Sequence, residues 1–181
     1  MDFSGNPSVS SFQNYGECFK LIKDYNLKTT VHIAETWKDP DLDYILKEIR
    51  PERIGHAVCL NKEYQSYLLA NQIPIEICPT SNLITKLVSS IDEHPFFEFY
   101  GVDRDYPLVI CTDDRGMFNT SQTHEQFLIA KTFKLSLQDI YDLNMRTLKF
   151  IFDESEATTD FLQKKFEYFK LNNLKENRFI E

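Results

Sequence analysis

Residues able to bind metals or transfer protons stand at the ends of short apolar runs in this sequence. The run TTVHIAET ends in His32 and Glu35, RIGHAV contains His56, and LVICTDD ends in Asp113 and Asp114. Two adjacent carboxylates at the end of a buried strand are costly unless a positive group lies beside them. We therefore expect a metal ion, a basic side chain or a substrate proton next to Asp113 and Asp114.

A further run of the same kind, IEICPTSN, ends in hydroxyl and amide side chains at Thr80, Ser81 and Asn82. In α/β barrels the active site is built at the C-terminal ends of several different strands. A single histidine at a strand end is more often structural than functional. Four consecutive runs with the same arrangement, however, predict one shared site.

The residue types suit one kind of chemistry. Histidine nitrogens and carboxylate oxygens are zinc ligands, and a catalytic zinc site keeps a position open for water. Zinc activates such a water as a nucleophile near neutral pH. Glu35 follows His32 by three residues and lies beyond the regular strand, so it could carry a proton. A second histidine and a second aspartate could orient the water.

The elements that must position these side chains alternate between two periods. Short β-branched or apolar runs predict strands at 28–34, 53–58, 73–78 and 108–111. Helical spacing of apolar residues predicts helices at 12–22, 42–49 and 64–68, and two more at 136–152 and 159–171. This alternation is typical of βαβ units around a parallel sheet.

Composition limits the classes of partner. The 181 residues carry a net charge of -8, which argues against non-specific binding to nucleic acid or to an anionic membrane. There is no long uncharged apolar run and no signal-peptide pattern at the start, so we expect a cytoplasmic protein. Cys18, Cys59, Cys78 and Cys111 show no C-x-x-C spacing and are expected to be reduced thiols rather than disulfides or zinc ligands.

Taken together, these segments resemble the adenosine deaminase family of metal-dependent hydrolases. VHIAE resembles its H-x-x-E strand end, RIGHAV its R-I-G-H segment, CPTSN its C-P-x-S-N strand, and CTDD the T-D-D end of its last barrel strand. DFSGNP at 2–7 resembles the D-L-S-G-x-P loop after the fourth strand, and all five segments occur in family order. The continuation CTDDRGMFNTS is closer to the adenosine deaminase-like branch, the N6-methyl-AMP deaminases.

The resemblance implies an α/β fold, namely the C-terminal part, about strands five to eight, of a TIM (β/α)8 barrel with additional C-terminal helices. A complete barrel takes about 250 residues. The family's H-x-H pair on the first strand is missing, since the four histidines are His32, His56, His94 and His124. We therefore expect 1–181 to form a single partial domain that lacks the N-terminal half of the barrel and is inactive in isolation. His94 and His124 have no family role and are expected to be solvent-facing or structural.

The resemblance also implies roles for the strand-end residues. His32 and Asp113 would be ligands of one Zn²⁺ per active site in the full-length enzyme. Glu35 would protonate a purine ring nitrogen while water attacks the adjacent carbon. His56 would stabilise the charge of that water, and Asp114 would hold the water and a ring nitrogen.

The implied substrate is a purine nucleoside monophosphate, with N6-methyl-AMP converted to IMP and methylamine. The backbone of Gly5 would contact the purine. Thr80, Ser81, Asn82 and Arg115 are candidates for the phosphate, on grounds of charge and hydroxyl groups alone. We expect neither nucleic acid nor membrane as a partner, and a monomer when the protein is full length.

Several alternatives stay open from the sequence. The chain could belong to a deaminase of free adenosine, or be a non-catalytic nucleotide-binding or interaction fragment. Asp113 and Asp114 could simply cap a following helix, whose N-terminus favours negative charge. Cytidine-type zinc deaminases are excluded because their H-x-E and P-C-x-x-C signature is missing.

Overall fold

The fold is built on one parallel sheet, seen here in a computed structural model that describes residues 1–6 and 11–174. Its strands follow the chain in order: β1 (Asp2–Phe3), β2 (Thr30–Ile33), β3 (Arg53–His56), β4 (Ile75–Ile77) and β5 (Leu108–Ile110). Strands β2 to β5 lie within the four predicted ranges, which confirms those predictions and the α/β class. The two-residue strand β1 was not predicted.

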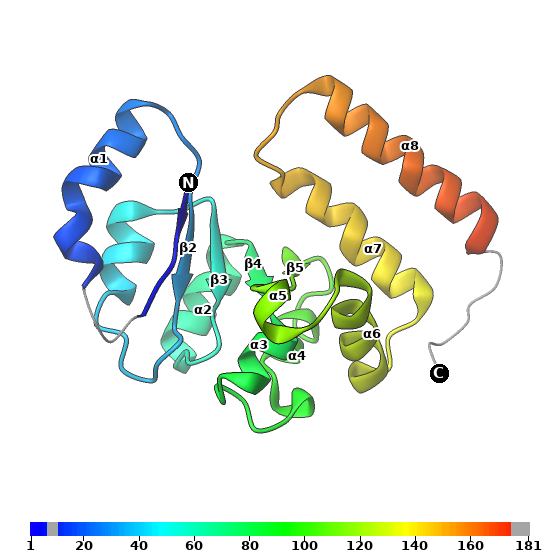
Figure 1. Ribbon diagram of the computed structural model, residues 1–181, viewed down its shortest axis with the longest axis horizontal. Coiled ribbons are helices and arrows are strands. Elements are labelled where there is room, and N and C mark those ends of the chain that lie inside the picture. The colour runs from blue at the N-terminus through cyan, green and yellow to red at the C-terminus, as the bar shows by residue number, and fades with distance from the viewer. Residues whose placement is uncertain (7–10, 175–181) are drawn as a thin grey trace.

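Helices connect and cover the strands (Figure 1). Their bounds are Phe12–Tyr15 (η1), Gly16–Asp24 (α1), Tyr44–Ile49 (η2, a π-helix), Lys62–Asn71 (α2), Pro79–Ile84 (α3), Ile91–Glu93 (η3), Phe96–Tyr100 (α4), Arg115–Phe118 (α5), Gln122–Phe133 (α6), Leu137–Thr147 (α7), Leu148–Phe150 (η4) and Glu156–Asn173 (α8). Each predicted helix is present, although two of them divide: 12–22 into η1 and α1, and 136–152 into α7 and η4. The short helices α3, α4 and α5 escaped prediction because four to six residues carry too little periodicity.

The two faces of the sheet differ in polarity because side chains alternate along each strand. Val31 and Ile54 are fully buried on the face that the helices cover, and Ile77 is almost as buried. On the opposite face, here called the inner face, lie Thr30 and His32 of β2 together with their neighbours in register. Thr30 pairs with Arg53, and His32 with Gly55, which in turn pairs with Glu76. Polar chemistry is thus gathered on one side of the sheet.

A paired network fills the inner face below the site. Glu76 accepts hydrogen bonds from the Thr30 hydroxyl at 3.0 Å and from Nε of Arg53. Arg53 also donates to the backbone carbonyl of Phe150, and its guanidinium lies 3.7 Å from the ring centre of Phe152. These partners compensate both charges, and they tie the segment after α7 to the sheet.

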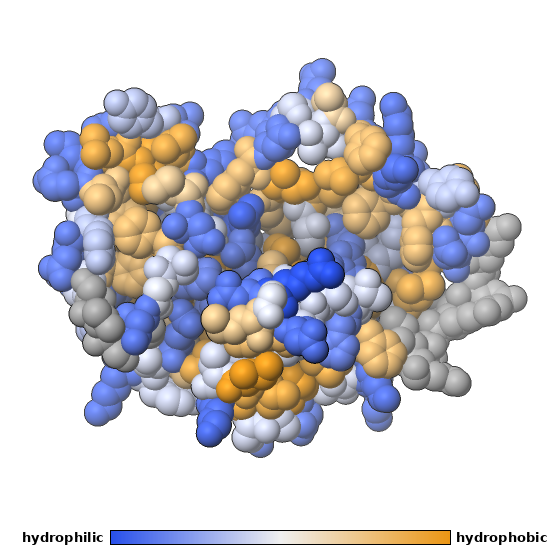
Figure 2. Space-filling view, in the orientation of Figure 1, coloured by the Kyte–Doolittle hydropathy of each residue, from blue (hydrophilic) through white to orange (hydrophobic). Residues whose placement is uncertain are grey.

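The helices at the two ends of the sheet stand apart. Figure 1 shows α1 at one end and the α7–α8 pair at the other, and Figure 2 shows a hollow in this face of the molecule between them. The ring of Tyr141 on α7 lies 5.9 Å from Phe166 and 6.4 Å from Phe169 on α8.

No helix within the described residues is long and apolar enough to cross a membrane. All four cysteines are free.

Candidate active site

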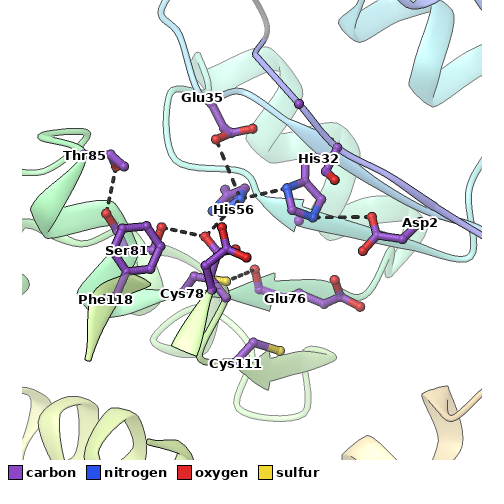
Figure 3. A pocket seen from close by; sticks show the side chains of 15 residues that line it. Asp2, His32, Glu35, His56, Glu76, Cys78, Ser81, Thr85, Cys111 and Phe118 are labelled. Atoms are coloured by element: carbon purple, nitrogen blue, oxygen red, sulfur yellow. Dashed lines mark hydrogen bonds and ion pairs between the residues drawn. The ribbon is translucent and has the colours of Figure 1, made fainter. Parts of the chain in front are cut away.

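A pocket of about 510 Å³ opens at the C-terminal ends of the strands, where the sequence predicted one shared site. Seven of the predicted site residues line it: Gly5, His32, Glu35, His56, Ser81, Asp113 and Asp114. They come from four separate strand ends and from the loop after β1. In Figure 3, Glu35 and His32 lie on two sides of His56, and Asp2 lies beyond His32.

His32 occupies its place because residue 55 is a glycine. The two residues are neighbours in register on β2 and β3. A Cβ atom on Gly55 would lie 2.8 Å from Cδ2 of the His32 ring, which is closer than such atoms can approach. Nδ1 of His32 lies 3.0 Å from Nε2 of His56, and its Nε2 lies 3.5 Å from Oδ1 of Asp2. Gly55 is a site residue for which the sequence reasoning assigned no role.

The backbone turns sharply where the strands end. Ala34, His56, Ala57 and Asp113 all have positive φ angles, of 53°, 61°, 53° and 53°. Residues other than glycine rarely adopt this conformation, and strained backbone of this kind clusters at active sites. The turns direct His56 and Asp113 into the same pocket.

Glu35 lies beyond the end of β2 and faces the two histidines. Its Oε2 is 3.7 Å from Nε2 of His56. Burial raises the pKa of Glu35 above its ordinary value; Asp113 and Asp39 raise it as well, and His32 opposes them. A carboxyl group with a raised pKa is suited to give up a proton near neutral pH.

Asp113 is oriented by Ser81, whose hydroxyl donates to Oδ2 of Asp113 at 2.6 Å. The same oxygen lies 3.9 Å from Nε2 of His56. Asp114 precedes α5 at the N-cap position but makes no side-chain capping bond. Helix capping therefore does not account for this pair of aspartates.

His56 is held from behind by a buried row of side chains. Its Nδ1 lies 3.0 Å from Nδ2 of Asn82, and Oδ1 of Asn82 lies 3.1 Å from Nε2 of His94. Asn82 is fully buried and His94 is 3% exposed, so His94 is structural rather than solvent-facing, whereas His124 is exposed. Burial, and next the charge of His32, lower the pKa of His56 to about 4, with Asp113 opposing. His56 is thus a neutral ring at pH 7.

The candidates for the phosphate are placed unequally. Ser81 lines the pocket, but among the described residues the pocket lining does not include Thr80, Asn82 or Arg115. The backbone amide of Thr80 donates to the carboxylate of Glu125 at 2.9 Å. Arg115 is exposed at the start of α5. The contacts of Ser81 and Asn82 hold Asp113 and His56, whereas contact between Arg115 and the phosphate stays a prediction.

The donor set suits a metal ion of the zinc type. His32, Glu35 and His56 present donor atoms within 4.8 Å of one another, and so do His56, Cys78 and Asp113. The predicted ligands His32 and Asp113 fall in different groups that share His56. Imidazole nitrogens and carboxylate oxygens are ordinary zinc ligands, and zinc takes four ligands in all. The described residues therefore fit as part of such a site.

Eight pocket residues had no assigned site role from the sequence: Asp2, Ser4, Gly55, Glu76, Cys78, Thr85, Cys111 and Phe118. A glycine inside a strand signals close approach of another group, so Gly55 could have been found. Burial raises the pKa of the Cys78 thiol, which keeps it protonated in the absence of a metal. The contact between Asp2 and His32 joins residues 30 positions apart, so no local sequence pattern predicts it.

Comparison with known protein families identifies one match, described as adenosine deaminase, over residues 2–165. Human N6-methyl-AMP deaminase is 34% identical over 176 residues, which cover 94% of this chain and 49% of the human protein. An Arabidopsis thaliana N6-mAMP deaminase is 36% identical over 157 residues, or 87% of this chain and 43% of that protein.

Solved structures agree with these sequence matches. Arabidopsis ADAL complexed with IMP superposes with a TM-score of 0.86 at 33% identity, covering 94% of this chain and 49% of that one. A bacterial amidohydrolase solved with bound Zn shares the fold alone, with a TM-score of 0.75 at 12% identity. The chain spans about half the length of the curated relatives it matches. Its sheet corresponds to part of their barrel, which confirms the predicted fold.

Proposed function

Since this chain belongs to the adenosine deaminase family, we propose that it forms part of a zinc-dependent deaminase acting on a purine nucleoside monophosphate. The reaction is hydrolysis of N6-methyl-AMP to IMP and methylamine, in which the C6–N bond breaks and water supplies the oxygen. The observation that carries the proposal is the convergence of Glu35, His56 and Asp113 in one pocket. The relatives named for N6-methyl-AMP deamination support the choice of substrate.

The chemistry divides among the pocket residues. His32 and Asp113 would hold the zinc, which supplies an activated water when bound. Glu35, with its raised pKa, gives a proton to the purine ring nitrogen and makes the neighbouring carbon easier to attack. Asp114, exposed at the pocket rim, holds the attacking water and a ring nitrogen of the purine. The backbone of Gly5 contacts the purine.

The remaining metal ligands are proposed to come from outside these residues. Two proposed ligands leave a four-coordinate ion incomplete, and the described half-barrel leaves its inner face uncovered. We therefore propose that residues 1–181 form one partial domain, that the isolated chain is inactive, and that the strands completing the barrel supply the missing donors. The completed protein is proposed to be monomeric and cytoplasmic.

The test is a deamination assay on a chimera in which this chain is completed by the other half of the Arabidopsis relative. We expect turnover of N6-methyl-AMP, and a loss of kcat of about 10²- to 10⁴-fold in Glu35→Gln, as for removal of a general acid. Glu63→Gln, which changes an exposed glutamate on α2, should be unaffected. Full activity in Glu35→Gln would contradict the mechanism.

The same assay decides the substrate class. A monophosphate enzyme should lose apparent affinity for N6-methyl-AMP in Arg115→Ala, because a cation facing the phosphate is removed. The exposed Lys20 on α1 provides a matched control, Lys20→Ala. Faster turnover of free adenosine than of its monophosphate would instead identify an adenosine deaminase.

A further inference from the structure

The hydrogen bonds in the buried row that ends at His56 have a fixed order of donor and acceptor. The row runs from the backbone amide of Phe96 to Nδ1 of His94 at 3.1 Å, from Nε2 of His94 to Asn82, and from Asn82 to Nδ1 of His56. Contacts between side chains alone would allow several arrangements, because a histidine proton can sit on either ring nitrogen and an amide can point either way. The row begins, however, at a backbone N–H group, which can only donate.

That fixed end determines every proton in the row. Because Nδ1 of His94 accepts from Phe96, it carries no hydrogen. Burial lowers the pKa of His94 to about 4, so the ring is neutral at pH 7 and its single proton sits on Nε2. This Nε2–H group needs an acceptor, and only the oxygen of Asn82 can serve. The amide nitrogen of Asn82 is then the atom that faces His56 and donates to its Nδ1.

From this geometry we infer that His94 is a positioning residue, which acts through Asn82 to place the proton of His56 on Nε2, the nitrogen that faces the pocket. A ring nitrogen that accepts a hydrogen bond carries no proton, so the imidazole then has its single proton on the other nitrogen. Since Nδ1 of His56 accepts from Asn82, Nε2 must be the protonated nitrogen. His56 therefore presents a hydrogen-bond donor, and not a base, to whatever lies in the pocket.

The surroundings of Nε2 agree with a donor. His32 Nδ1 lies 3.0 Å away, Glu35 Oε2 3.7 Å away and Asp113 Oδ2 3.9 Å away. All three can accept a hydrogen bond. A base at this position would instead turn a lone pair toward two carboxylates.

The catalytic consequence rests on the proposed function. A neutral His56 with its proton on Nε2 cannot take a proton from the attacking water at that atom. It can donate to the oxygen of that water and stabilise the negative charge that develops there. Removal of the water's proton then falls to a carboxylate in the pocket.

The competing explanation for the row is that Asn82 and His94 are hydrogen-bonded only because buried polar atoms need partners. Asn82 and His94 are buried, and buried polar groups need partners wherever they lie. That explanation asks only that each atom be paired, and it does not specify how His56 carries its proton. The location of the proton therefore distinguishes the two explanations.

The experiment is nitrogen NMR of the histidine rings in the ¹⁵N-labelled, metal-free 181-residue chain at neutral pH. We expect His56 and His94 each to show a protonated Nε2 and an unprotonated Nδ1. The spectra of His32→Gln, His94→Gln and the exposed control His124→Gln assign three of the four histidines, and His56 follows by elimination. A proton on Nδ1 of His56, or an averaged mixture of the two forms in the wild type, would overturn the inference.

Three variants test the direction of the hydrogen bonds in the row. Asn82→Asp replaces the donor by a carboxylate that only accepts, so the proton of His56 should move to Nδ1. His94→Phe should leave His56 with a mixture of both forms, while His94→Gln, whose amide can donate to Asn82, should restore one form. An unchanged His56 in folded Asn82→Asp would contradict the inference, and the wild-type spectrum decides it if the variants fail to fold.

These measurements need no catalysis, so failure of the inference and failure of the proposed function can be told apart. A fixed proton on Nε2 together with an inactive chimera would count against the function alone. An active chimera with a proton on Nδ1 of His56 would count against the inference alone.

Discussion

At the scale of single residues, the contact between His32 and Gly55 shows how little room the site has. A methyl group on residue 55 would meet the His32 ring at 2.8 Å from Cδ2. The ring is also within hydrogen-bond distance of His56. A change at a position without functional groups should therefore disturb both histidines.

Gly55→Ala should displace the His32 ring and lower the free energy of unfolding by about 1–3 kcal/mol, as overpacking does. Chemical denaturation and the His32 NMR signals would measure the two effects. Gly116→Ala is the matched control, because a Cβ there meets nothing within 4 Å. It should be neutral or slightly stabilising, since alanine favours helix over glycine. Equal effects of the two changes would contradict the proposed steric role.

His94 carries a second residue-scale prediction, which concerns pH. Burial, with a smaller effect of His56, lowers its pKa to about 4, from about 6.5 in an unfolded chain. Between these values the unfolded chain binds a proton that the folded chain excludes. The stability is therefore full above about pH 6.5 and falls toward pH 4, by up to about 1.4 kcal/mol per pH unit.

His94→Gln should remove this part of the pH dependence, while the similar contribution of His56 remains. Unfolding free energies measured from about pH 7 to about pH 4.5 would show a smaller slope in the variant. His124→Gln, at an exposed position, should keep the wild-type slope. Identical slopes in all three proteins would show that His94 does not resist protonation.

At the scale of elements, α7 and α8 have similar caps but different surroundings. Ser136 caps α7 through a capping box with Asp139, and Ser155 caps α8 by accepting from Thr158. Helix α7 buries three of its residues, whereas α8 buries none. Loss of the N-cap should therefore destabilise the whole fold at α7 and only the helix itself at α8.

Ser136→Ala should lower the free energy of unfolding by about 0.5–2 kcal/mol, the usual cost of a lost N-cap. Ser155→Ala should change it much less, because α8 can fray without exposing a buried residue. Thermal unfolding of both variants would measure this. A larger effect for Ser155→Ala would mean that α8 contributes more to the fold than its burial indicates.

The elements also show which parts of the fold can be predicted from a sequence. Strands β2 to β5 could be located because parallel strands covered by helices read as apolar runs, and their ends carry polar residues such as His32 and Asp113. Helices of four to six residues leave no such pattern. The row through Asn82 was hidden because His56 and His94 lie 26 and 12 residues away in sequence. Nonlocal contacts of this kind decide that Asn82 supports the site rather than lining it.

At the scale of the whole molecule, the sheet has two strands at its ends, β1 and β5, each paired on one side only among the described residues. Strand edges of this kind can pair with further strands. Because those strands are proposed to supply the missing metal ligands, metal binding should report on completion of the barrel.

The isolated chain should bind zinc weakly, because its two proposed ligands do not fill four positions. Mixing it with the separately produced complementary half of a relative should raise the metal content toward about one per complex. His32→Ala should abolish that gain, whereas His124→Gln should not. Elemental analysis after gel filtration would measure it, and tight zinc binding by the chain alone would contradict the need for further donors.

The network of Arg53, Glu76 and Thr30 has a practical consequence for such mixing experiments. Hydrophobic surfaces left open by a missing segment associate with almost any apolar partner, so their complexes carry little information. Here the open face is occupied by an ion pair and a hydroxyl that already satisfy one another. A complex that forms across this face should therefore depend on matching shape and register, and it should discriminate between complementary halves taken from different relatives.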